Sequence, residues 1–514
     1  TMFGRRNLCL AGSVLFVFGL GLAAWVLAAN SAPAPAAAAT DAKAPEPAVP
    51  AAAATDAKAA AATGALSSTA PIDVRLYGAK GDGTTDDTAA FQAAIEAARA
   101  TSMKVYAPRA RYLFAGRLNV PAGMTLEGSF DSVTSHPGGG RGRGGRGGQA
   151  GQPDGTMFLV TGDAGKEDAP AFITLNGNST LRGVAILYPE QTTTETPKAY
   201  PYSVAMRGNN PAVLDVELIN SYNGIDASRN QRHLIRNVSG QPLHIGVFVD
   251  GIMDIGRMEN VHFNPWWGGG AAVRKFMMEN GVAFIFGRSD WEYVLDTFCF
   301  GYNTGYKFIR SKVSSGNCNG NFLGVGADDC YTAVLVEESA PFGLLITNGE
   351  FTAFHGPDPT EVDVPATNRG SVRFVNCSFW GPGNQIAKIA GGTVGFSDCT
   401  FVEWGGKAND LPAIQATAGT VIVRGCEFIK RAPAMNLGEG VRRAVITGNV
   451  FSLPEASAGI VNKSAGNVQI GLNSFGAAGG GPAARPRPAA PAGTGTSATG
   501  ASATGTSATE DVEQ

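Results

Sequence analysis

The sequence predicts an all-β fold, a parallel β-helix in which the chain winds into a solenoid, with a capping helix at its N-terminal end. Three observations support this prediction. A phenylalanine recurs every 22 to 28 residues between Phe351 and Phe475. Glycine is abundant at 69 residues and charged residues make up only 16% of the chain, a composition typical of many tight turns and few long helices. A glycine-rich turn followed by a helical pattern opens the repetitive part at residues 73–98.

Residues 1–30 have the sequence pattern of a transmembrane or signal segment. Arg5 and Arg6 precede an apolar run from Leu8 to Ala29. This run matches the roughly 20 residues of a spanning helix better than the shorter core of a secretory signal, and positive residues before it are expected to stay in the cytoplasm. We expect a single transmembrane anchor in the cell membrane, with the body outside the cytoplasm. The alternative is a signal helix cleaved near Ala29, which makes the protein secreted.

Two low-complexity segments flank the body. Residues 31–71 consist largely of Ala, Pro and Thr, and Thr-Asp-Ala-Lys occurs in them at 40–43 and 55–58. Residues 476–514 repeat Thr-Ser-Ala-Thr-Gly-like units. Such segments bury little apolar surface, so we predict an extended linker and a disordered tail. The folded domain is predicted to span 72–475.

The body opens with a short strand, a glycine-rich turn and a helix. Thr85, Asp86 and Asp87 offer side-chain oxygens at the predicted helix N-terminus, where acids also suit the helix dipole. Phe91 and Ile95 lie on one apolar face at helical spacing. We therefore expect a structural role for the acids of this segment.

The repeat places a small or polar residue two positions before each phenylalanine. Self-similarity at such a period is the signature of a solenoid, and a spacing of two puts both residues on the same face of a strand, which we expect to be the interior. The copies are Asn348-Gly-Glu-Phe351, Asn376-Cys-Ser-Phe379, Asp398-Cys-Thr-Phe401, Gly425-Cys-Glu-Phe428, Gly448-Asn-Val-Phe451 and Leu472-Asn-Ser-Phe475, with earlier variants at Asp215-Val-Glu-Leu218 and Asn260-Val-His-Phe263.

Three of the seven cysteines occupy one slot of this repeat. Cys377, Cys399 and Cys426 share it, and Asn449 and Asn473 continue it. Neighbouring coils lie about 4.8 Å apart, but parallel side chains rarely have the direction that a disulfide needs. We expect an interior ladder of free thiols and no metal site, because thiolates in line do not converge on one ion.

The opening segment from Asp73 to Ile95 resembles that of the pectate-lyase-like β-helix proteins. This group includes polygalacturonases, rhamnogalacturonase-like proteins, some exo-glucanases and phage tailspikes. The resemblance implies a right-handed parallel β-helix whose open end is covered by the helix. It also implies a protein that binds or cleaves polysaccharides in a groove walled by loops.

The richest polar and aromatic stretch is 250–296. Arg288, Asp290 and Glu292 alternate, so in an extended strand they project to one face. Two carboxylates beside an arginine match a general acid and base, with the arginine keeping one of them ionised. The alternative is a solvated polar face of a strand. Further candidates for substrate binding in this stretch are Asp250, Trp266, Trp267, Trp291 and Tyr293.

Trp266 and Trp267 belong to a loop, since Asn264-Pro265 precedes them and Gly268-Gly-Gly270 follows. Two roles fit adjacent tryptophans in a loop. They stack on sugar rings, or they pack the loop onto the wall of the solenoid.

A second constellation resembles that of polygalacturonases, which carry Asn-Thr-Asp, Asp-Asp, Gly-His-Gly and Arg-Ile-Lys on successive coils. This chain has Asn303-Thr304-Gly305, then Asp328-Asp329-Cys330, then His355-Gly356. The resemblance implies Asp328 and Asp329 as catalytic carboxyl groups and His355 as a further site residue; the alternative for the two acids is a turn between strands. Gly305 stands where the first Asp belongs, Phe354 replaces the first Gly, and no Arg-Ile-Lys follows, so that mechanism does not transfer whole.

A formal charge of −3 gives no support to a nucleic-acid partner. The stretch 138–148 contains Gly-Arg-Gly-Arg-Gly-Gly-Arg, which resembles an RNA-binding arginine–glycine box. We expect it to be a flexible insertion over one edge of the solenoid.

Three functions remain open. The first is a glycoside hydrolase of polysaccharides without a cofactor, using Asp290 with Glu292 or Asp328 with Asp329. The second is a uronate lyase, in which Arg288 is the base and Ca²⁺ binds at Asp250 and Asp254. The third is a non-catalytic carbohydrate-binding surface protein, favoured by the anchor, the linker and the incomplete polygalacturonase set. The sequence determines neither the sugar nor the oligomeric state.

Overall fold

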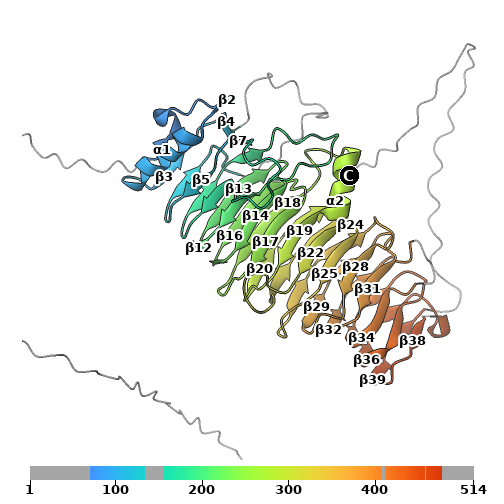
Figure 1. The fold of residues 1–514 in the computed structure, drawn as a ribbon. Coiled ribbons are helices and arrows are strands. Elements are labelled where there is room, and N and C mark those ends of the chain that lie inside the picture. The colour runs from blue at the N-terminus through green and yellow to red at the C-terminus, as the bar shows by residue number, and fades with distance from the viewer. Residues whose placement is uncertain (1–69, 133–154, 407–410, 458, 477–514) are drawn as a thin grey trace, which may run out of the picture. The chain divides into compact units, whose positions relative to one another are not determined.

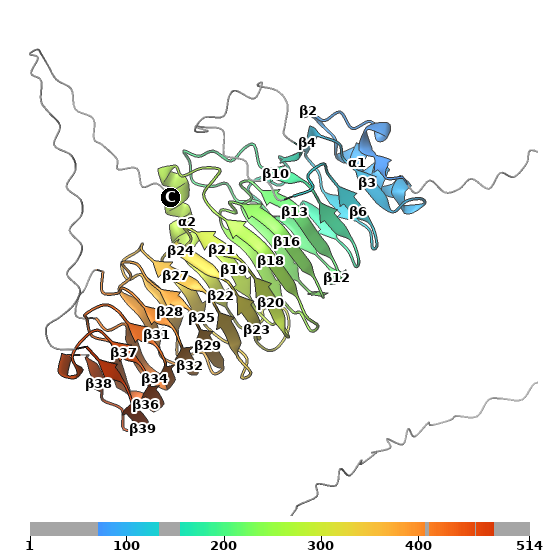
Figure 2. The same ribbon diagram turned by 180° about the vertical axis from the view of Figure 1, so that it is seen from behind.

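The computed structural model describes residues 70–132, 155–406, 411–457 and 459–476. These residues form a mostly-β parallel solenoid, which confirms the predicted β-helix (Figures 1 and 2). The predicted anchor, most of the linker, the arginine–glycine stretch and the tail lie outside the described residues. Within the described part of the chain, neither helix combines the length and the apolar character that crossing a bilayer requires.

Each coil contributes a strand to each of three parallel ladders. The first ladder contains β1 (Ile72–Asp73), β3 (Lys104–Tyr106), β6 (Thr125–Glu127), β9 (Thr180–Arg182), β13 (Ala212–Leu218), β16 (Leu234–Gly240), β18 (Arg257–Phe263), β20 (Glu292–Leu295), β23 (Gly320–Leu323), β26 (Leu344–Thr347), β29 (Ser371–Val375), β32 (Thr393–Ser397), β34 (Ile414–Arg424), β36 (Met435–Thr447) and β39 (Asn467–Gly471).

The second ladder shares the C-terminal parts of β13, β16 and β18 with the first. Its other strands are β2 (Asp82–Asp86), β4 (Ala110–Phe114), β7 (Thr156–Val160), β10 (Ala185–Leu187), β21 (Phe298–Phe300), β24 (Gly326–Cys330), β27 (Glu350–Ala353), β30 (Ser378–Phe379), β33 (Thr400–Phe401), β35 (Glu427–Phe428), β37 (Val450–Phe451) and β40 (Ser474–Phe475).

The third ladder includes the N-terminal parts of β34 and β36. Its other strands are β5 (Leu118–Val120), β8 (Ile173–Leu175), β11 (Tyr202–Met206), β14 (Asn223–Ser228), β17 (Ile245–Asp250), β19 (Val282–Phe286), β22 (Thr304–Phe308), β25 (Thr332–Val336), β28 (Thr360–Val364), β31 (Gln385–Ile389) and β38 (Ile460–Asn462). Outside the ladders, β12 (Gly208–Asn209) pairs with β15 (Asn230–Gln231), and short 3-10 turns occupy Val74–Tyr77 and Glu455–Ser457.

Helix α1 (Thr88–Arg99) packs at the N-terminal end of the solenoid. Phe91 is fully buried, and its ring meets those of Tyr112, Phe114 and Phe158 edge-on at centroid distances of 5.0, 4.9 and 5.6 Å. This aromatic cluster covers interior side chains that the first coils leave without a neighbour.

The acids at the start of α1 hold the backbone, as expected for a structural role. The side chain of Asp86 accepts from the backbone N–H of Thr88 at 3.0 Å and so provides the helix cap. Asp87 instead reaches back to the N–H groups of Lys80 and Gly81, at 2.6 and 3.1 Å. Asp82 accepts from the Thr84 and Thr85 N–H groups and hydroxyls, which lowers its pKa.

The repeat has the predicted orientation. Phe379, Phe401, Phe428 and Phe451 are buried, and successive rings stack at 5.3, 4.4 and 4.8 Å between centroids. The first residue of each copy, Asn348 for example, has a positive φ and forms a one-residue corner between the first and second ladders. Asn tolerates this left-handed conformation better than most residues.

The cysteine slot also faces the interior. Cys377, Cys399 and Cys426 are buried free thiols, and burial together with contact between neighbouring thiols raises the pKa of Cys399 to about 12. Asn449 continues the ladder by accepting from the Cys426 N–H at 2.9 Å. Contact with Cys399 lowers the pKa of Cys426, whereas the pKa values of Cys377 and Cys399 are raised. Because all three thiols are buried in apolar surroundings, they act as packing groups.

Helix α2 (Ala271–Asn280) stands outside the ladders beside β19 and β24 (Figure 1). It follows Gly268–Gly270, where a Cβ at Gly270 would lie 1.9 Å from the Thr193 carbonyl oxygen. At the other end of α2, the Asn303 N–H donates to the Met277 carbonyl at 3.0 Å. These contacts fix the helix beside the corner where β24 meets β25.

Candidate functional site

The predicted trio of Arg288, Asp290 and Glu292 does not share one face. Glu292 is completely buried, whereas Asp290 is partly exposed and pairs with Arg288 at 2.8 Å between Oδ2 and Nη2. The reason is a turn at Asp290–Trp291, in which Trp291 has a φ of 67°. The chain is not extended there, so strict alternation fails and the predicted carboxylate pair does not form.

Glu292 instead belongs to a polar network inside the solenoid. One carboxylate oxygen contacts Nε2 of His233 at 3.1 Å, and the other accepts from the Ser289 hydroxyl. Nδ1 of His233 lies 2.9 Å from Oδ1 of Asn230. The side chains of His233 and Glu292 have no exposed surface, so Glu292 has no access to substrate.

Asp250 is also a support for the backbone. It is fully buried, and its two oxygens accept from the N–H groups of Arg288 and Lys312 at 2.8 and 2.7 Å. Asp254, the other proposed Ca²⁺ ligand, pairs with Arg232. Each acid therefore has a separate partner, and the described residues contain no group of three or more His, Cys, Asp or Glu arranged to hold a metal.

The remaining aromatic candidates of this stretch lie in different places. Trp267 is partly buried against the core, and its backbone N–H donates to the Gln241 side chain at 2.9 Å. The Trp266 ring lies 4.7 Å from the His262 ring on the outer side of β18. Tyr293 carries the Arg257 guanidinium 5.9 Å above its ring. Trp267 thus packs the loop onto the solenoid wall.

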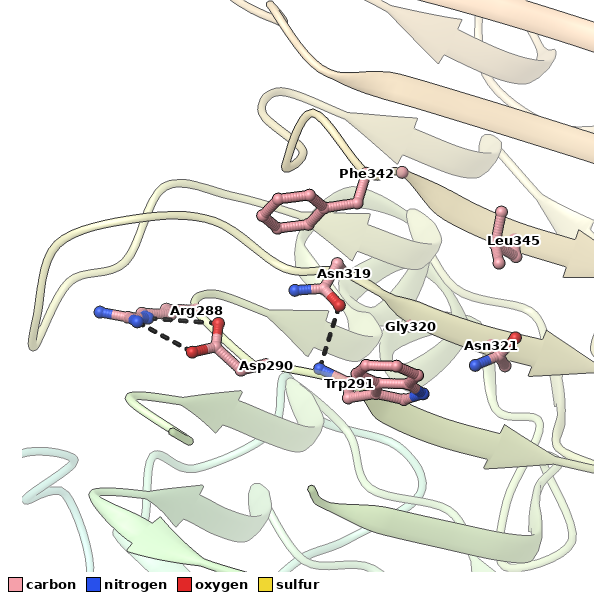
Figure 3. A pocket seen from close by; sticks show the side chains of 9 residues that line it. Arg288, Asp290, Trp291, Asn319, Gly320, Asn321, Phe342 and Leu345 are labelled. Carbon is pink, nitrogen blue, oxygen red and sulfur yellow. Dashed lines mark hydrogen bonds and ion pairs between the residues drawn. The ribbon is translucent and has the colours of Figure 1, made fainter. Parts of the chain in front are cut away.

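Arg288, Asp290 and Trp291 line a cavity of about 610 Å³ at the edge of the first ladder, here called the Trp291 pocket (Figure 3). Neighbouring coils add Asn319, Gly320, Asn321, Phe342, Gly343 and Leu345. Only one carboxyl group, that of Asp290, lines this pocket among the described residues. A pair of catalytic carboxyl groups is therefore absent from its described lining.

The second predicted constellation does come together. Oδ2 of Asp329 pairs with Nη2 of Arg274 on α2 at 2.9 Å, and Oδ1 contacts Nδ1 of His355, from the loop after β27. Nε2 of His355 lies 3.1 Å from the same Arg274 nitrogen. Asp328, Asp329, His355 and Arg274 are together called the Asp328 cluster below. The cluster joins two coils and a helix, so no single segment defines it.

Asp328 and Asp329 lie in different environments. The Asp329 side chain is 3% exposed; burial raises its pKa, against the lowering effects of His355 and Arg274. Asp328 is half-buried on the outer side of β24, next to Phe300 of β21. Burial also raises the pKa of Asp328, opposed by hydrogen bonds from the Asp329 N–H and from the Thr352 hydroxyl at 3.3 Å. A raised pKa in a carboxyl group with outward access is the property of a general acid.

A cavity of about 610 Å³ opens beside the cluster. Arg274, Lys275, Asn303, Tyr331 and His355 are among its lining residues. His355, with 41% of its side chain exposed, and Arg274, with 50%, reach solvent here. The Asn303 and His355-Gly356 parts of the polygalacturonase-like pattern thus line this cavity, and Asp329 is joined to them through His355.

The departure at Gly305 has a steric cause. This residue is buried, and an added Cβ would lie 2.7 Å from the Ala333 carbonyl oxygen and 2.8 Å from the Ala327 Cβ. There is no room for the missing aspartate, so the cluster has two carboxyl groups.

Sequence reasoning missed Arg274. It is 55 residues before Asp329 and 81 before His355, and it belongs to no motif. Its one sequence signal is its place in a short helical stretch directly after the Trp-Trp-Gly-Gly-Gly loop, which marks an insertion at this coil.

The fold and the cluster define a class, a parallel β-solenoid with acids and a histidine at a corner between the second and third ladders. A family model described as "Rhamnogalacturonase A/epimerase, pectate lyase-like" matches residues 72–137. Over these residues the chain has the sequence of the pectate lyase-like, rhamnogalacturonase A-like β-helix family. This confirms the resemblance of the opening segment.

The chain is similar to known proteins over a short stretch of sequence or, at low TM-scores, in structure. The non-secreted LysM effector LysM19 of Penicillium expansum is 41% identical over 63 residues, which cover 12% of this chain and 5% of that protein. The gene product 12 N-terminal fragment of bacteriophage Phi29 has a TM-score of 0.45 at 12% identity, covering 78% of this chain and 72% of that one. The catalytic unit of the GH87 α-1,3-glucanase of Streptomyces thermodiastaticus has a TM-score of 0.41 at 11% identity, covering 79% and 70%.

Proposed function

We propose that the protein is a glycoside hydrolase that cleaves a polysaccharide at the Asp328 cluster. The observation that carries this proposal is the meeting of Asp329, His355 and Arg274 beside one open cavity, with Asp328 next to Asp329 on the outer side of β24. Hydrolysis of a glycosidic bond needs an acid for the leaving oxygen and a base for the attacking water. The cluster offers both in neighbouring positions.

Asp328 takes the role of the acid. Its carboxyl group is half-buried, its pKa is raised, and it faces outward from β24. In the proposed reaction it gives its proton to the glycosidic oxygen as the bond to the anomeric carbon breaks. The carboxylate that results is stabilised by the Thr352 hydroxyl and the Asp329 N–H.

His355 takes the role of the base. Its Nδ1 is oriented by Asp329, as expected for a histidine held in one tautomer by a carboxylate. Nε2 accepts the proton of the attacking water once Arg274 exchanges its 3.1 Å contact with this nitrogen for a substrate oxygen. The proton gained by His355 and the proton lost by Asp328 then exchange with solvent. Asp329 and Arg274 are positioning residues in this scheme.

The lyase alternative has weaker support from the geometry. Its base Arg288 is paired with Asp290, and the proposed cation ligands Asp250 and Asp254 have separate partners. The binding-protein alternative is favoured by one specific observation: Asp329 is almost completely buried and paired, which leaves Asp328 as the one accessible carboxyl group of the cluster.

The test uses the full chain with a panel of pectic, uronate-containing and neutral glycans. Reducing ends and the absorbance of unsaturated uronate are followed together. We expect new reducing ends without the chromophore, and a loss of about 10²-fold or more in kcat for Asp328→Asn and for His355→Gln. The control is Asp398→Asn, at the corner between β32 and β33 and outside the Asp328 cluster, which should keep full activity.

Other outcomes separate the alternatives. Chromophore formation means a lyase and overturns the proposal. Binding without turnover across the panel means a carbohydrate-binding protein. Equal turnover by the wild type and by Asp328→Asn means that the Asp328 cluster is not the catalytic site.

A further inference from the structure

Two aromatic side chains stand in solvent at the edge of the first ladder. Trp291 is 59% exposed and Phe342 is 77% exposed. Trp291 precedes β20 and Phe342 precedes β26, and β23 pairs with both of these strands. The two loops are therefore two coil steps apart, about 10 Å along the solenoid. Exposed apolar side chains gathered in this way mark an interaction site.

Gly320 and the two asparagines beside it belong to the coil between the two rings. Gly320 lies there, and an added Cβ would come within 2.2 Å of the Glu292 carbonyl oxygen, so the strand has no room for a side chain. Asn319 and Asn321 flank this glycine with their amides. In Figure 3 the Trp291 indole and the Phe342 ring lie on either side of Asn319. Aromatic faces beside amide groups match the apolar faces and hydroxyl groups of sugar rings.

The backbone of Trp291 is held in place by its neighbours. Its φ of 67° is uncommon for a bulky residue and needs support from the surroundings. Asn319 accepts from the Trp291 N–H at 3.1 Å, and the next residue, Glu292, is fixed inside by Ser289 and His233. A strained and supported backbone that presents an exposed indole is typical of a preorganised binding site.

The charges of the pocket compensate each other. Arg288 pairs with Asp290 through two hydrogen bonds, and its Nη1 donates to the Ser315 carbonyl at 3.0 Å. No other charged residue belongs to the described lining of the pocket. The pocket is therefore neutral overall, which favours an uncharged ligand.

We propose that the Trp291 pocket is a glycan-binding site for a neutral pyranose chain, with Trp291 and Phe342 stacking on two of its rings. It is separate from the Asp328 cluster, because β20, β23 and β26 belong to the first ladder and Asp328 belongs to the second. The inference does not rest on hydrolysis at Asp328. Its role is to hold polysaccharide on a second face of the solenoid.

The experiment measures binding with the full-length Asp328→Asn chain, which prevents turnover if Asp328 is the acid. The probes are laminarin and hydroxyethyl cellulose, both neutral, and polygalacturonate, which is anionic. Affinity electrophoresis gives the dissociation constants, and tryptophan fluorescence detects contact with an indole. We expect a neutral probe to bind, and Trp291→Ala and Phe342→Ala each to weaken that binding at least tenfold. Trp291→Phe should restore part of it.

The control variant changes an exposed aromatic residue outside the Trp291 pocket. Tyr77→Ala removes another exposed aromatic ring, 39% exposed at the N-terminal end, and should not change binding. Unchanged binding in Trp291→Ala overturns the proposal, as does failure of both neutral probes to bind. If Trp291→Ala instead changes only the molar mass by light scattering, the face joins two copies of the chain and the proposal is wrong.

Discussion

Asp328 and Asp329 follow each other in the chain but have different surroundings. Asp329 has a φ of 52°, which turns its carboxyl group toward Arg274 and His355. Asp328 stays on the outer side of the strand beside Thr352. One residue in a left-handed conformation thus separates a buried, paired carboxylate from an accessible one. This difference underlies the division of roles in the proposed hydrolase.

The Thr352 hydroxyl is one of three influences on the pKa of Asp328, after burial and the Asp329 N–H. Its hydrogen bond favours the ionised carboxylate, so Thr352→Val should raise the pKa of Asp328 further. Because the acid must be protonated, activity falls as pH rises through this pKa. The alkaline limb of the kcat/KM profile should therefore move upward by roughly 0.4–1 pH unit in the variant. A downward shift, or an unchanged limb, contradicts the assignment of Asp328 as the acid.

Glu361 is a buried carboxyl group that takes no part in the proposed reaction. Neither oxygen has a hydrogen-bond partner among the described residues, and burial raises the pKa of Glu361 well above 4.5. The flanking coils have Ala333 and Ile386 at this position. The folded state therefore keeps a proton that the unfolded chain releases above pH 4.5. Stability is highest below that pH and falls as pH rises toward the folded pKa.

Glu361→Gln should remove this pH dependence. Glutamine copies the neutral acid, so the variant and the wild type should be about equally stable at pH 4. Above pH 4.5 the variant should gain up to about 1.4 kcal/mol of unfolding free energy per pH unit until the folded pKa is reached. Denaturant unfolding at pH 4, 6 and 8 measures this. A difference that stays constant with pH contradicts a protonated Glu361.

At the scale of elements, strands supply the scaffold and the connections supply both proposed sites. The Trp291 pocket forms where three successive connections enter β20, β23 and β26. The Asp328 cluster forms where β24 turns into β25 and where α2 and the loop after β27 cover that corner. Parallel pairing brings corresponding connections of successive coils side by side. A site therefore collects residues that are one coil apart in sequence.

Restoring the polygalacturonase-like aspartate should fail for reasons of space. In Gly305→Asp the side chain meets the Ala333 carbonyl and Ala327 in the interior of β22 and β25. We expect a loss of at least about 3 kcal/mol of stability from overpacking and from a buried carboxyl group. Chemical denaturation measures the loss, and Gly301→Ala, at an open position with positive φ, is the milder control. A stable and more active Gly305→Asp variant contradicts this account.

At the scale of the molecule, stability passes from coil to coil. The interior is one continuous cluster that runs from Val74 to Phe451, but each coil contacts mainly its neighbours, as in other repeat proteins. The N-terminal end depends on α1, because Phe91 covers the first coils. The ends of the solenoid are therefore the places where local unfolding should begin.

Phe91→Ala tests this dependence. Removing the ring from its aromatic cluster should cost about 3–5 kcal/mol. Hydrogen exchange measured by mass spectrometry should show the loss of protection in β3, β4 and β7, whereas β26 to β33 keep theirs. Phe428→Ala removes a similar ring from the central stack. In this variant, protection from hydrogen exchange should be lost in β33 and β35 instead. A uniform loss in both variants means that the solenoid unfolds as one unit.

The sequence by itself determined the solenoid, its interior phenylalanines and its ladder of thiols. Strand alternation and coil length are local properties, so the copies from Asn348 to Phe475 predict the register without coordinates. The resemblance to polygalacturonases named Asp328, Asp329 and His355 as candidates, and their spacing of about one coil is consistent with the contact between Asp329 and His355. Only the tertiary structure decided that Glu292 points inward and that Arg274 joins the cluster. Both depend on a connection, the turn at Trp291 and helix α2, whose conformation is set by contacts with neighbouring coils rather than by its own sequence.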